Sequence, residues 1–149
     1  MGTNEYFCKA YTIAFRLTGE ERIASQMAAL AIENTAPEMS SGDVPSIMLK
    51  DTAGEILRIF LSEPNFQTFY FNKTLNDTVY SKNLMLQKAV LSLEPINRAA
   101  IVWRDMLGFK IDDLAVAAKC SKQTLYCELN NARRHLRTLL IDCSAKETL

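Results

Sequence analysis

Cysteine, histidine and paired aspartates are the residues of this 149-residue chain that could bind a metal or carry out catalysis. The four cysteines stand at positions 8, 120, 127 and 143, and the one histidine is His135. No two cysteines have the spacing of two to four residues that is typical of zinc sites. Asp112 and Asp113 are adjacent, so on a helix they point in different directions, and we expect Asp112 to be a helix N-cap. The sequence also has no phosphate-binding glycine loop and no nucleophile elbow. It therefore predicts no metal site, no cofactor and no enzyme activity.

The overall composition excludes further classes of function. The chain has 17 basic and 17 acidic residues, so its zero net charge offers none of the general attraction to nucleic acid that a strongly basic domain has. With 48% hydrophobic residues it can bury a core. No apolar run approaches the roughly 18 residues that cross a bilayer, and the N-terminus lacks the pattern of a signal peptide. We expect a cytoplasmic protein with reduced thiols and no membrane partner.

A row of polar residues near the C-terminus could bind nucleic acid rather than a metal. Their side chains can hydrogen-bond to base edges or to phosphate oxygens, and at helical spacing they lie away from an apolar stripe. Basic residues at the end of a solvated helix give a similar pattern, because cations interact favourably with the C-terminal dipole, and this alternative stays open. The residues that we predict to contact DNA are Ser121, Lys122, Gln123, Tyr126, Asn130, Arg133 and Arg134.

Two helices joined by a tight turn are expected to position this row. The segment 112–119, DDLAVAAK, predicts a short helix whose alanines allow a close helix crossing. Ser121 is a suitable N-cap for the long helix that follows, and the first turns of that helix would project into a DNA major groove. The sequence thus predicts a helix-turn-helix, although any three-helix bundle also has short helices joined by tight turns. The inward stripe of the long helix is Leu125, Leu129, Ala132 and Leu136.

Helical periodicity continues through most of the remaining chain. Residues 4–34 predict two helices separated by Gly19, residues 46–61 predict a third, and residues 84–93 and 95–108 predict two more. Trp103 is expected in the core. The inward positions of the first three helices are predicted to be Phe7, Tyr11, Ala14, Phe15, Leu17, Ile23, Met27, Leu30, Ala31, Ile47, Met48, Ala53, Ile56, Leu57 and Phe60.

These elements indicate an all-α protein of two small helical domains. Residues 1–63 form the first domain, residues 64–83 a linker and residues 84–149 the helix-turn-helix domain. The linker is rich in aromatic residues, Asn and Thr, and a pair of strands there is the alternative. We expect the two domains to pack together and to bury the recognition surface. The aromatic anchors of this closed state would be Phe66, Phe69, Tyr70 and Phe71.

Residues 91–140 resemble region 4 of bacterial sigma factors, especially those of the extracytoplasmic-function class. The ending Ala-Arg-x-x-Leu-Arg at residues 132–137 separates this pattern from other bacterial helix-turn-helix families. One departure is Glu128, which stands where sigma factors commonly have a basic residue. Its carboxylate must point inward or accept a hydrogen bond from a cytosine amino group. The residues that carry the resemblance are Leu93, Pro95, Arg98, Gly108, Asp113, Leu114, Ala115, Ser121, Thr124, Leu125, Leu129, Ala132, Arg133, Leu136 and Arg137.

The N-terminal half resembles region 2 of the same family through residues 15–19, FRLTG, and Ala24. The resemblance implies that the next helix contacts RNA polymerase. Two acidic residues of the family pattern are replaced here by Ser25 and Gln26, and residues 36–60 contain no counterpart of the aromatic residues that melt promoter DNA. The positions implied as polymerase contacts are Ser25, Gln26, Ala29 and Leu30.

The resemblance implies a transcription initiation factor that binds core RNA polymerase and promoter DNA, with an anti-sigma factor as a further partner. The departures in the N-terminal half leave a second interpretation open. In that interpretation the chain is a sigma-like regulator, or a decoy that binds an anti-sigma factor and no longer initiates transcription.

Overall fold

The computed structural model describes residues 1–36, 45–66 and 82–147, and all regular structure within these ranges is helical. The prediction of an all-α fold is therefore confirmed. Within the same ranges no helix combines the length and apolar character needed to cross a membrane. The elements are α1 (Thr3–Thr18), α2 (Glu21–Thr35), α3 (Ser46–Ser62), the 3₁₀ turn η1 (Pro64–Phe66), α4 (Lys82–Leu91), α5 (Pro95–Ala100), the π-helix η2 (Ile101–Met106), α6 (Ile111–Ala118) and α7 (Lys122–Glu147).

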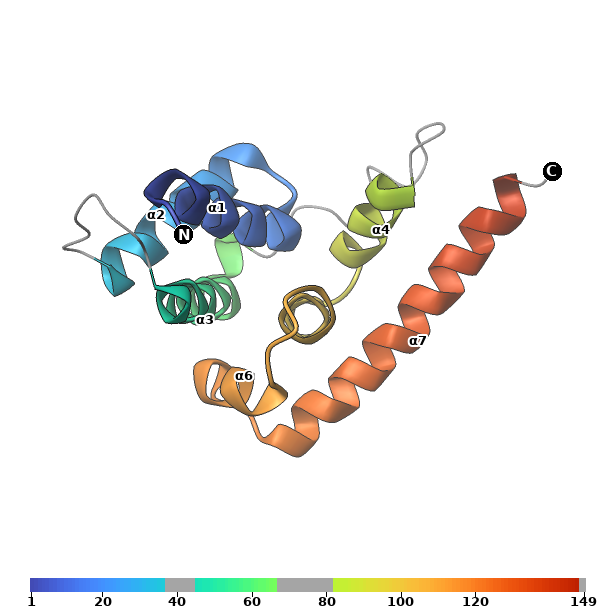
Figure 1. Ribbon diagram of the computed structural model, residues 1–149. Helices are drawn as coiled ribbons and strands as arrows, with labels where there is room; N and C mark the ends of the chain where they lie inside the picture. Colours follow the sequence, from blue (N-terminus) through green and yellow to red (C-terminus); the bar gives the residue numbers. More distant parts are fainter. Residues whose placement is uncertain (37–44, 67–81, 148–149) are drawn as a thin grey trace.

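The helices α1, α2 and α3 pack on one another at the N-terminal side of the molecule (Figure 1). Gly19 ends α1 in the left-handed conformation, with φ of 67°, and its N–H donates to the Phe15 carbonyl oxygen over 2.8 Å. Glycine adopts this conformation without the steric penalty that a Cβ brings, so the predicted position of the first turn is confirmed.

The predicted inward faces of these helices were wrong at three positions. Phe7, Leu30 and Ile47 are 42%, 42% and 62% exposed. In α1 the inward aromatic residue is Tyr6, whose hydroxyl hydrogen-bonds to the Thr52 hydroxyl of α3. The chain offers apolar residues at neighbouring positions, so periodicity alone allowed more than one phase of the helix. Five of the eleven buried residues of α1 and α2 are alanines, which let the helices approach closely: Ala10, Ala14, Ala24, Ala28 and Ala31.

The continuous helix formed by α5 and η2 lies at the centre of the molecule. Every residue from Arg98 to Trp103 is buried, which a helix with only one inward face does not allow. Contacts with α1, α3, α6 and α7 surround this helix, and Arg98 hydrogen-bonds to the end of α4. Figure 1 shows the central helix nearly end-on between the N-terminal helices and α7. Ile101 and Val102 are buried, whereas Met106 is only half-buried.

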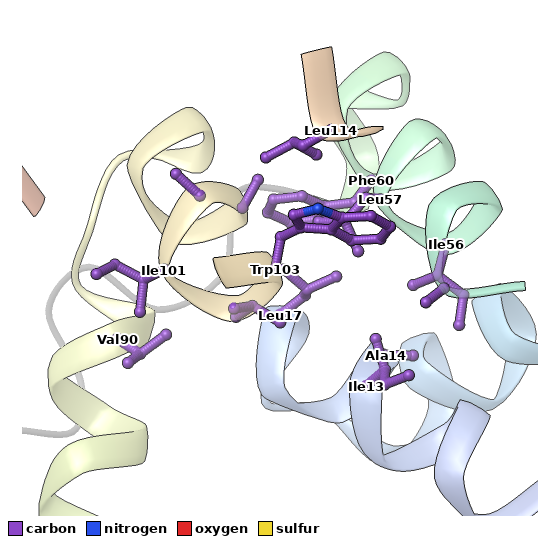
Figure 2. Packing of buried hydrophobic residues seen from close by; sticks show 14 of the residues in the cluster. Ile13, Ala14, Leu17, Ile56, Leu57, Phe60, Val90, Ile101, Trp103 and Leu114 are labelled. Carbon is purple, nitrogen blue, oxygen red and sulfur yellow. The ribbon is translucent and has the colours of Figure 1, made fainter. Parts of the chain in front are cut away.

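Trp103 joins the two halves of the chain. Figure 2 shows its ring beside Phe60 and Leu57 of α3, with Leu114 of α6 on one side and Leu17 of α1 on the other. The indole N–H donates to the Lys110 carbonyl oxygen over 2.7 Å. The prediction that Trp103 belongs to the core is confirmed. One buried cluster thus runs from α1 through α3 to α6 and α7.

Of the four aromatic anchors expected in the segment 64–83, Phe66 is the one that lies among the described residues. Phe66 is half-buried and packs against the buried cluster. Phe69, Tyr70 and Phe71 lie outside the described residues, as does any strand pair there.

The predicted N-cap of α6 was wrong. This helix begins at Ile111, with Lys110 as its N-cap, so Asp112 and Asp113 lie in its first turn. The buried Ile111 side chain belongs to the core, which fixes the chain in helical conformation one residue earlier than expected. Both carboxylates still lie near the positive end of the helix dipole, where negative charge is favourable.

Candidate nucleic-acid interface

The helices α6 and α7 form a helix-turn-helix around a short turn. Lys119 ends α6 in the left-handed conformation, with φ of 54°. The Thr124 N–H donates to the Ser121 Oγ over 3.1 Å, which confirms Ser121 as the residue that caps the last helix. The fully buried Leu114 and Leu125 hold the two helices to the core. The first turns of α7 therefore extend from a fixed support.

The residues predicted to contact DNA are all exposed, while the predicted inward stripe of α7 is buried. The phase of this helix is thus confirmed, and DNA contact itself stays a prediction. The expectation that packing of the two halves buries the recognition surface was wrong, because α6 and not α7 lies against α3. The exposed residues are Ser121, Lys122, Gln123, Tyr126, Asn130, Arg133 and Arg134.

Lys122, at the start of α7, is held by an acidic residue of α6. Its Nζ lies 3.0 Å from an Asp112 carboxylate oxygen and 5.9 Å from the centre of the Tyr126 ring. The hydrogen bond and the negative charge of Asp112 raise the pKa of Lys122. The ammonium group of Lys122 therefore has an acidic partner ten residues earlier in the chain.

Arg133 is paired in the same way with an acidic residue of the central helix. Its Nε and Nη2 donate to the two carboxylate oxygens of Asp105 over 2.9 and 2.6 Å. This two-pronged hydrogen bonding raises the pKa of Arg133. Sequence reasoning missed Asp105, since it precedes its partner by 28 residues and no local pattern joins them.

Glu128 does not lie on the exposed polar face. Its side chain is half-buried and points toward α5, where the Asn97 side-chain amide donates to its carboxylate. Of the two alternatives left open by the sequence, the inward orientation is the one found. Among the side chains of α7 that the structure describes, the exposed polar face therefore carries no carboxylate.

Beside the two ion pairs, the exposed face carries polar side chains with no such partner. Among the residues that the structure describes, Gln123 and Asn130 make no side-chain hydrogen bond and Arg134 makes no ion pair. Amide side chains of this kind can bond to two atoms of an adenine edge, and an arginine can bond to phosphate.

A second exposed surface lies on α2. The predicted polymerase contacts Ser25, Gln26, Ala29 and Leu30 all face solvent on this helix. Ile23, Ala24, Met27 and Ala28 face the core from the same turns. This surface is uncharged at the four predicted positions, and a neutral surface relies on shape and apolar contact for binding rather than on charge.

The residues first considered for metal chemistry stay apart. No group of three His, Cys, Asp or Glu side chains within the described ranges could hold a metal ion. Asp113 pairs with Lys50 of α3 over 2.7 Å, so the two adjacent aspartates bind different lysines. Cys8 and Cys127 are exposed free thiols and Cys120 is a partly buried one, while the Cys143 side chain lies outside the described residues.

Comparison with known proteins gives one informative likeness. No family model matches the sequence, and no curated protein matches it. Among solved structures, the chain is similar to the sigma factor RpoE from Bartonella quintana, which was crystallised in complex with the anti-sigma factor NepR. The TM-score is 0.63 at 16% sequence identity, and the match covers 92% of each chain.

The chain has the fold of a sigma factor. This likeness extends over the N-terminal helices as well as the helix-turn-helix, although the sequence resemblance was faint in the N-terminal half. At 16% identity the likeness is one of fold alone.

Proposed function

We propose that this protein is a sigma-factor-like transcription initiation protein rather than an enzyme. In this proposal residues 1–63 bind core RNA polymerase, residues 84–149 bind promoter DNA, and residues 64–83 link the two parts. The main support is the sigma-factor fold across 92% of the chain. Such a protein would act in the bacterial cytoplasm, where the polymerase and the promoters are.

The DNA-binding part of the proposal is supported by the orientation of α7. Leu125 and Leu129 are buried while Gln123, Tyr126 and Asn130 are exposed, so one face of the helix holds it in the fold and another is available to a groove. Amide and phenol groups suit base edges, and cations at both ends of the row suit phosphates.

Alanine substitutions on α7 are expected to separate contact from core. Gln123→Ala and Tyr126→Ala should leave the free energy of unfolding nearly unchanged and weaken discrimination between promoter sequences, because both side chains face solvent. Leu129→Ala is the matched comparison from the buried face and should cost roughly 2–5 kcal/mol by opening a cavity. Urea denaturation and transcription from a set of promoters measure the two effects. Unfolding caused by Gln123→Ala would contradict this assignment of the helix faces.

Binding to polymerase is tested by gel filtration of the purified protein with bacterial core RNA polymerase. We expect the two to co-migrate, and Leu30→Glu to abolish co-migration without unfolding the chain, because Leu30 lies on the exposed α2 face. Ile47→Glu is the matched control, since Ile47 is also an exposed apolar residue but lies on α3. Failure of the folded wild-type protein to co-migrate would contradict the proposal.

The second candidate function is a sigma-like regulator or a decoy that binds an anti-sigma factor. Two observations favour it: the predicted polymerase contacts on α2 carry no charge, and the structural neighbour was crystallised with an anti-sigma factor. A folded protein that fails to bind polymerase but is captured by an anti-sigma factor would support this function over transcription initiation.

A further inference from the structure

The polar face of α7 meets two carboxylates that come from outside this helix. Asp112 of α6 pairs with Lys122 at its first turn, and Asp105 of η2 pairs with Arg133. Lys122 and Arg133 are 11 residues apart, which is about three helical turns or roughly 16 Å along the axis. The polar side chains available to bases lie between these two ion pairs.

We propose that Asp105 and Asp112 are intramolecular competitors of DNA phosphates, which hold the intrinsic DNA affinity of this helix-turn-helix low. This inference rests on the proposed DNA-binding function. In the free protein each carboxylate occupies the cation that a phosphate would otherwise contact. DNA binding then exchanges two protein ion pairs for phosphate contacts and leaves two negative charges beside the DNA backbone.

The charges on the exposed face of α7 support this exchange of protein ion pairs for phosphate contacts. A cation that is already neutralised by a carboxylate has fewer counterions and phosphates to gain, so it adds little to the salt-dependent part of DNA affinity. With both pairs intact, Arg134 is the remaining basic residue among those predicted to contact DNA. Binding would therefore depend more on base contacts by Gln123 and Asn130 than on general attraction to the backbone.

The two ion pairs are partly exposed to solvent, so the fold does not depend on them. The side chains of Lys122 and Asp112 are 53% and 54% exposed, and those of Arg133 and Asp105 are 44% and 35% exposed. Ion pairs this open to water contribute little to folding stability, so their carboxylates can be neutralised without unfolding the chain. Neutralising either carboxylate is therefore expected to change DNA affinity rather than folding stability.

An opposite role for the aspartates gives the opposite result. If Asp105 held Arg133 in the orientation that a phosphate needs, as an anchoring carboxylate does for an arginine, its removal would weaken DNA binding. The sign of the change in affinity therefore distinguishes competition from positioning.

The experiment measures binding of a short fluorescein-labelled DNA duplex of random sequence by fluorescence anisotropy, at salt concentrations between about 50 and 200 mM. The variants are Asp105→Asn, Asp112→Asn and the double variant. Glu5→Gln with Glu33→Gln is the matched control, since it removes the same amount of charge from exposed positions on α1 and α2. Circular dichroism establishes that each variant is folded. Arg134→Ala tests whether DNA lies on this face of α7.

Each aspartate substitution is expected to tighten binding roughly two- to fivefold at the lowest salt, the double variant more, and the control variant clearly less. The dependence of log affinity on log salt should also steepen by up to about 0.9 for each released cation.

Two results would overturn the inference and are distinguishable. If the wild-type protein binds DNA and Arg134→Ala weakens that binding, but the aspartate variants bind no tighter than the control, competition is wrong and the proposed function stands. If no folded variant binds DNA, either alone or in the presence of core RNA polymerase, the DNA-binding function fails and the inference fails with it.

Discussion

Arg98→Ala is expected to destabilise the folded chain by roughly 3–5 kcal/mol. The guanidinium group is fully buried and donates to three backbone carbonyl oxygens, those of Leu17 at 2.7 Å and of Leu91 and Leu93 at 3.0 Å each. Leu17 and Leu91 lie in the last turns of α1 and α4, where carbonyl oxygens have no further turn of helix to accept from, and Leu93 lies in the turn after α4. Alanine would leave all three without a partner and would open a cavity at the junction of the two halves.

The burial of Arg98 also carries a cost, which the hydrogen bonds must offset. Loss of water lowers the pKa of its guanidinium to about 10, against the weaker opposite effect of Glu94. Because the pKa is lower in the folded than in the unfolded chain, the unfolded state binds this proton more tightly, and the cost is present at every pH below about 10. Its Nε has no hydrogen-bond partner, and the Phe60 ring lies 5.5 Å from the guanidinium carbon.

Two further variants make the Arg98 prediction specific. Arg98→Lys keeps the charge but replaces a fork of donors by a single ammonium group, so it should recover only part of the lost stability. Arg58→Ala is the surface control, since Arg58 is exposed and pairs only with exposed or partly exposed acids, and it should cost less than about 1 kcal/mol. Urea denaturation followed by circular dichroism measures all three. An Arg98→Ala protein as stable as the Arg58→Ala protein would show that the buried contacts do not hold the two halves together.

Trp103→Ala is expected to cost roughly 3–5 kcal/mol, because it removes the largest side chain of the shared core. The ring fills the space between α3, α6 and α1 (Figure 2). It also contacts Phe109, with ring centres 4.8 Å apart. Its loss would leave the Lys110 carbonyl without the indole N–H and would loosen α6 from α3. We therefore expect the helix-turn-helix and the N-terminal helices to lose stability together.

The test of this prediction compares Trp103→Ala with Trp103→Phe, which keeps an aromatic ring and should cost less. Thermal unfolding is followed by circular dichroism, since the variants lack the only tryptophan of the chain. In the wild-type protein the fluorescence of Trp103 reports directly on the junction and should change in the same transition as the helical signal. Separate transitions for the two signals would mean that the halves fold independently of Trp103.

Local sequence signals determined most of the secondary structure of this protein. Gly19 and Gly108, with φ of 67° and 77°, mark the ends of two helices because glycine accepts a left-handed conformation. Ser121 caps α7, and Pro95 begins α5, since a missing N–H costs nothing in the first turn. The apolar stripe of α7 was also correct, because its leucines recur at helical spacing with polar residues between them.

The tertiary structure alone decided which faces are buried and which charges are paired. Phe7 faces solvent because the neighbouring Tyr6 takes the inward position of α1 and hydrogen-bonds to Thr52 of α3, and Ile47 is likewise exposed. The burial of Arg98 and the pairing of Asp105 with Arg133 join residues far apart in the chain, and no spacing rule predicts such contacts. Periodicity and capping act over one or two helical turns, so the sequence determined the helices and the exposed face of α7. Contacts between distant helices depend on the packing of the whole chain, which determined the shared core and the acidic partners of the exposed cations of α7.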